Sequence, residues 1–84
     1  MALTERQEVD KIEVVGQFRA AQIRTATVIE RDGEEISRSY HRHIIQPGTD
    51  YSGEVAEVQA VCAAVHTEEV IAAYQAYMTS SNNI

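Results

Sequence analysis

The chain has 84 residues, the length of one small domain, and hydrophobic residues make up 44% of it, enough for a core. Its 13 acidic and 7 basic side chains give a formal net charge of −6, which disfavours binding to nucleic-acid backbones and to anionic membranes. Aromatic residues are few, one Phe and four Tyr, so the core must be largely aliphatic.

Cysteine content and hydropathy narrow the possibilities further. Cys62 is the single cysteine, so an intramolecular disulfide is excluded. Residues 1–10 are polar, and we therefore expect no secretory signal peptide. The longest apolar run is far shorter than the roughly 20 residues that a membrane-spanning helix needs.

The first predicted strand covers residues 9–15, which include Ile12, Val14 and Val15. Residues 1–8 are polar and are expected to be flexible. Gly16 follows the strand and permits a turn, because glycine adopts positive φ without steric cost.

A β-hairpin is predicted next, with strands over residues 20–31 and 34–46. Asp32-Gly33 separates two segments rich in Thr, Val and Ile, and this dipeptide favours a type I′ turn. Pro47-Gly48 should end the second strand, since proline has no N–H to donate to a ladder.

A regular two-residue turn predicts which residues share a face of this hairpin. It pairs Ile29 with Ile36, Thr25 with Tyr40, Ile23 with Arg42 and Ala21 with Ile44. One face would then be apolar, with Ile23, Ile29, Ile36, Tyr40 and Ile44. The opposite face would be mostly polar, and we expect an interaction surface there formed by Arg24, Ser37, Ser39, His41 and His43.

Two helices are predicted after the hairpin, over residues 53–65 and 67–79. Val55, Val58, Val61, Cys62 and Val65 form an apolar stripe on the first, with Ser52 or Asp50 as its N-cap. Val70, Ile71, Tyr74, Tyr77 and Met78 form the stripe of the second, with Thr67 as its N-cap. Residues 79–84 are polar and are expected to be flexible.

The predicted fold is therefore a single α+β domain over residues 1–84. It consists of a three-stranded antiparallel β-meander covered on one face by two C-terminal helices. Such a small domain, with free sheet edges and one free face, favours association with a protein partner or with itself, and we expect a homo-oligomer.

Candidate chemistry is sparse. His41 and His43 are two residues apart in a strand, so both imidazoles project from one face and could share a metal ion, but H-x-H alone is a weak pattern. Cys62 lies on a predicted apolar stripe and is interpreted as a buried structural residue. Ser37 and Ser39 share a face with the histidines, but no orienting acid is evident. We therefore expect no enzymatic activity and no cofactor.

Several segments resemble small proteins of unassigned role from tailed bacteriophages that infect aquatic bacteria, cyanobacteria among them. The resemblance rests on MALT (1–4), VDKIEVV (9–15), IRTATVI (23–29), EISRSYHRH (35–43) and VHTEEVIAAY (65–74). It covers most of the chain but includes no catalytic motif, so it implies an origin and not a set of functional residues.

The resemblance implies a non-enzymatic structural or interaction module of a phage particle, associated with the tail or virion. A first alternative is a small phage regulatory protein that binds and inhibits a host enzyme, whose basic nucleic-acid groove an acidic protein could occupy. A second alternative is a metal-binding protein that uses His41 and His43. The expected location is the virion or the host cytoplasm.

Overall fold

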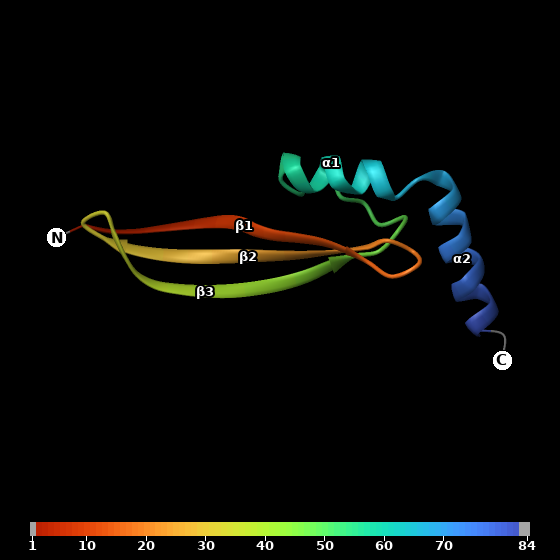
Figure 1. Ribbon diagram of the computed structural model, residues 1–84, viewed down its shortest axis with the longest axis horizontal. Coiled ribbons are helices and arrows are strands. Elements are labelled where there is room, and N and C mark those ends of the chain that lie inside the picture. Colours follow the sequence, from red (N-terminus) through yellow and green to blue (C-terminus); the bar gives the residue numbers. More distant parts are fainter. Residues whose placement is uncertain (1, 83–84) are drawn as a thin grey trace.

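The sheet and the helices follow one another along the chain. The computed structural model describes residues 2–82 and contains β1 (Leu3–Val15), β2 (Ala20–Arg31), β3 (Glu34–Ile45), α1 (Ala56–Val65) and α2 (Glu68–Asn82). The strands form one antiparallel sheet in the order β1-β2-β3 (Figure 1). This confirms the predicted α+β meander with two C-terminal helices.

Both ends of the chain have more regular structure than expected. Residues 3–8 were expected to be flexible but belong to β1, because β2 extends to Arg31 and pairs with β1 as far as Leu3. The Asp32 side chain accepts a hydrogen bond from the Ala2 N–H at 3.1 Å, which holds this end in place. At the other end α2 runs to Asn82, so 79–82 is helical, while residues 83 and 84 lie outside the described residues.

The tight turns agree with the sequence. Asp32 and Gly33 have φ of 52° and 85°, and a type I′ turn requires positive φ at both of these positions. Gly16 has φ of 80° in the turn between β1 and β2. The Asp-Gly dipeptide therefore marks the hairpin correctly.

The register of the hairpin differs from the prediction by one residue. Arg31 opposes Glu34 and Glu30 opposes Glu35, but Ile29 opposes Ser37, so Ile36 is an extra residue in a β-bulge. The predicted pairs beyond the turn, such as Ile29 with Ile36, are therefore wrong. Because side chains alternate between faces, every residue of β3 after the bulge lies on the face opposite to the one expected.

Two faces of the sheet can now be defined by the observed pairing. The helix-side face includes Val9, Ile12, Ala21, Ile23, Thr25, Thr27, Ile29, Ser37, Ser39, His41, His43 and Ile45. The open face includes Arg6, Glu8, Asp10, Lys11, Glu13, Gln22, Arg24, Ala26, Val28, Glu30, Glu35, Arg38, Tyr40, Arg42 and Ile44.

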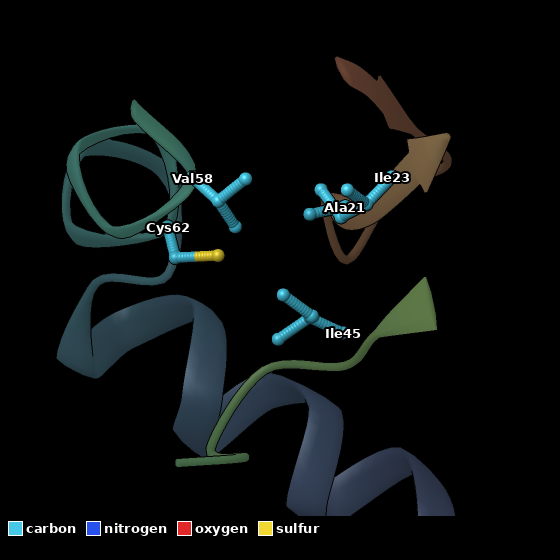
Figure 2. Close-up of a cluster of buried hydrophobic side chains, with 5 residues drawn as sticks. All are labelled: Ala21, Ile23, Ile45, Val58 and Cys62. Carbon is cyan, nitrogen blue, oxygen red and sulfur yellow. The ribbon is translucent and has the colours of Figure 1, made fainter. Parts of the chain in front are cut away.

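The core lies between the sheet and α1, at the end of the sheet where the chain leaves β3. Ala21, Ile23 and Ile45 pack there against Val58 and Cys62 of α1 (Figure 2). Burial of Cys62 confirms its structural interpretation. Ile45 is buried in this cluster, whereas its neighbour Ile44, predicted as core, is 56% exposed.

The helices begin after different kinds of cap. α1 starts at Ala56 after Val55, which makes no side-chain cap, so the predicted caps Ser52 and Asp50 are wrong. The Asp50 carboxylate instead accepts a hydrogen bond from the Ser52 N–H at 2.9 Å, which forms a turn before the helix. Thr67 caps α2 as predicted, with its Oγ1 accepting from the Val70 N–H at 3.2 Å.

α2 packs against the turns at the end of the sheet. The Phe18 ring contacts Tyr74 and Tyr77, with ring centroids 5.6 and 5.1 Å apart. The opposite end of the sheet, residues 3–6, 26–31 and 34–40, is called the distal arm. It extends beyond α1 (Figure 1) and supplies no residue to the core cluster.

The bulge can be tested by truncating two adjacent isoleucines. We expect Ile45→Ala to lower the free energy of unfolding by about 2–5 kcal/mol, because it leaves a cavity in the core. Ile44→Ala is the matched control and should cost about 0.5 kcal/mol or less. Urea denaturation measures both, and the reverse ranking would show that the unbulged register is correct.

The turn can be tested with two glycines that both have free space around them. Gly33→Ala should destabilise the protein by about 1–2 kcal/mol, because alanine is strained at φ of 85°. Gly53 has no positive φ, so Gly53→Ala should be neutral or slightly stabilising. Equal effects in thermal denaturation would contradict the type I′ assignment.

Candidate interaction surface

The bulge separates the five residues that were expected to form one interaction surface. Ser37, Ser39, His41 and His43 lie on the helix-side face, opposite Ile29, Thr27, Thr25 and Ile23. Arg24 lies on the open face, opposite Arg42. The expected surface is therefore wrong as a set, because it assumed a ladder without an extra residue.

Each edge strand has one bulge, and each bulge directs a carboxylate toward an arginine. Residues three apart in a regular strand point to opposite faces, but the extra Ile36 allows Glu35 and Arg38 to meet. The Arg38 guanidinium donates to both Glu35 carboxylate oxygens, at 3.1 and 2.8 Å. The bulge of β1 lies at Asp10, whose carboxylate receives two hydrogen bonds from Arg24 at 2.8 and 2.9 Å. These bidentate pairs are the strongest ion-pair geometry that proteins use.

The arginines set the ionisation of their partners. Arg24 holds the pKa of the Asp10 carboxyl below its ordinary value by donating to the charged form, and Arg38 does the same for Glu35. The pKa of each arginine is raised in turn by its carboxylate. Both carboxylates therefore stay ionised to a lower pH than the same groups without their arginine.

Further contacts join these pairs into a band of charge across the open face. Arg38 also approaches Glu8 at 3.4 Å, Arg6 contacts Glu30, and the Arg24 guanidinium lies 4.4 Å from the Tyr40 ring centroid. Ala26 and Val28 are fully buried between these long cross-strand neighbours.

Charge is divided unevenly between the open face and the rest of the molecule. The open face has five basic and five acidic side chains and is formally neutral: Arg6, Lys11, Arg24, Arg38, Arg42 and Glu8, Asp10, Glu13, Glu30, Glu35. The remaining residues therefore account for the whole net charge of −6. No lysine or arginine occurs after Arg42.

The helix-side face has a groove where the loop before α1 passes over the sheet. Val9 and Thr25 line its floor and Gly53, Glu54 and Val55 line the other side. His43 Nε2 is 3.0 Å from a Glu54 carboxylate oxygen, a contact that ties the loop to β3. Gln7 and Glu8 are the remaining lining residues of the groove.

The two histidines of the H-x-H pattern lie side by side as expected for a strand. Their ring centroids are 6.3 Å apart and the rings are nearly parallel, at 25°. Within residues 2–82 no group of three or more His, Cys, Asp or Glu side chains is placed to hold a metal ion.

His66 is a structural residue whose role the sequence analysis missed. It is 6% exposed, and its ring Nε2 donates to the Arg19 carbonyl at 2.7 Å. Its backbone N–H donates to the Cys62 carbonyl at the end of α1. The turn after β1 is thereby fixed to α1. The sequence feature that could have indicated this role is the position of His66 between the end of the first helix and the Thr67 N-cap of the second.

Comparisons with protein-family models, curated proteins and solved structures found no match to the chain. Within the described residues no helix is long and apolar enough to cross a membrane.

The Asp10–Arg24 pair predicts a specific response to acid. Because the folded-state pKa of Asp10 is lowered, the pair stabilises the fold above the unfolded-state pKa, and this contribution is lost as pH falls through the folded-state pKa. In an NMR titration Asp10 should titrate below its ordinary value of 3.8, and Arg24→Gln should raise its midpoint. Arg42→Gln, on the same face, is the control and should leave the midpoint in place.

Proposed function

We propose that the chain is a non-enzymatic structural or interaction module of a bacteriophage particle, associated with the tail or virion. The observation behind this proposal is the distal arm, a sheet that extends beyond the core with both faces accessible to other molecules (Figure 1). The phage setting comes from the sequence resemblance described above.

The dimensions of the molecule support a role in assembly. The principal extents are 59 × 26 × 18 Å and the radius of gyration is 17.0 Å. A compact chain of this length would have a radius of gyration of about 12 Å. An 84-residue chain that places about a fifth of its residues in an extended arm leaves surface unburied, and docking to another protein would bury it.

The polar groups of the arm are suited to binding rather than to chemistry. On its open face Glu35 and Arg38 neutralise one another, and on its helix-side face Ser37, Ser39 and Thr27 present hydroxyl groups. Burial removes the hydration of a neutral hydroxyl group, and hydrogen bonds from a partner offset that cost.

One observation favours the alternative of a phage regulatory protein that inhibits a host enzyme. The part of the chain after Arg42 has five acidic side chains, at Asp50, Glu54, Glu57, Glu68 and Glu69, and no lysine or arginine. An acidic helical end of this kind complements a basic groove that normally binds nucleic acid.

Mass spectrometry of purified particles separates the two proposals. We expect peptides of this chain in the particle at a constant ratio to the major structural proteins, and retained after a high-salt wash. Absence from the particle, together with a stoichiometric host protein in a pull-down of the tagged chain, would replace the leading proposal with the inhibitor. A matched pull-down in which Glu68 and Glu69 are changed to Gln tests whether the acidic end makes that contact.

A further inference from the structure

The two edges of the sheet are protected to different degrees. β1 has a bulge at Asp10 in its middle, and six of its 13 residues are charged: Glu5, Arg6, Glu8, Asp10, Lys11 and Glu13. Charges and bulges are the devices that keep an edge strand from pairing with another chain. The β1 edge is therefore closed to strand addition.

The β3 edge has fewer of these features beyond its bulge at Ile36. After the bulge, Ser37 to Ile45 pair with β2 without interruption. No proline or carboxylate occurs among them, and their charged residues are Arg38 and Arg42. Tyr40 and Ile44 are 50% and 56% exposed on the open face of this strand. An uninterrupted edge with exposed apolar side chains is a template for an added strand.

We propose that β3 pairs antiparallel with β3 of a second copy of the chain, about a two-fold axis at His41. This inference deepens the proposed function, on which it rests, by naming the partner of the interaction module. His41 is the midpoint of the regular segment 37–45, so this register pairs the segment over its whole length. The product is one six-stranded sheet.

The cross-strand pairs of this register are complementary. Tyr40 lies opposite Arg42 of the second copy, a pairing of an aromatic ring with a guanidinium that proteins favour. Arg38 lies opposite Ile44 of the second copy. A register centred one residue earlier, on Tyr40, would instead place Arg38 opposite Arg42, and like charges directly opposite are destabilising.

The two-fold axis also accounts for the distal arm. In an antiparallel pair the Ser37 end of one β3 lies beside the Ile45 end of the other. The helix-bearing end of each copy is then next to the distal arm of its partner, on the same face of the joined sheet. Figure 1 shows that α1 and α2 leave the outer edge of β3 uncovered.

The chain exposes more surface than a compact monomer of its mass. The chain exposes 5892 Å². A compact monomer of 9.4 kDa would expose about 5,000 Å². The excess of about 900 Å² reflects the elongated shape, and pairing along β3 would bury part of it.

A charge-reversal pair tests the register by light scattering of the full chain. The unmodified protein should have twice the monomer mass of 9.4 kDa. Tyr40→Arg places an arginine opposite Arg42 of the second copy and should weaken the dimer at least tenfold. Adding Arg42→Glu to that variant should restore the dimer, because the new pair has opposite charges. A strict monomer for the unmodified chain, or no restoration in the double variant, would overturn the inference.

Cross-linking through a single introduced cysteine tests the axis. His41→Cys should form a disulfide-linked dimer on mild oxidation, because each position 41 meets its own copy across the axis. Ser39→Cys is the matched control on the same face: it meets His43 of the second copy and should remain unlinked. Cys62 is buried and does not compete. Linking through Glu5→Cys instead would place the contact at β1 and overturn the inference.

These results are independent of the particle experiment. A chain found in the virion but monomeric in solution and unlinked by His41→Cys leaves the module proposal standing and removes the β3 dimer. A chain that forms the dimer but is absent from the particle leaves the β3 dimer standing and removes the module proposal.

Discussion

The extra residue at Ile36 determines most of what the surface of this protein displays. It allows the Arg38 guanidinium to reach both oxygens of Glu35 on one face. It also turns Ile45 into the core and places His43 within reach of Glu54. Without that residue the same strand would bury Ile44 and direct its histidines to the open side. Which side chains of β3 each face displays therefore depends on a single β-bulge next to the hairpin turn.

The architecture could be predicted from local sequence signals, and the face assignment could not. The Asp32-Gly33 turn, the three strands, both helices and the Thr67 cap each follow from a short pattern with a clear stereochemical cause. A bulge has no such pattern, because it is stabilised by contacts between residues that the bulge itself brings together. The apolar residues Ile36, Tyr40 and Ile44 fit the unbulged register equally well, so hydrophobic alternation alone favoured the wrong alternative.

The extent of β1 could not be predicted for a related reason. Residues 3–8 lack an apolar face because the distal arm has no helix against it, and a strand with two solvated faces has no periodicity to detect. Their order comes from pairing with β2 and from the hydrogen bonds between Ala2 and Asp32. The candidate surface was harder still to predict, because the grouping of its residues on one face depended on the register of the hairpin.

The position of the two chain ends has a mechanical consequence. Ala2 is held beside the hairpin turn at one end of the long axis, and α2 lies at the other (Figure 1). Tension applied between these ends acts along the strands, while the hydrogen bonds between β1 and β2 lie perpendicular to the strands. All of those bonds are then loaded together in shear rather than broken one after another. The sheet therefore resists extension along its length.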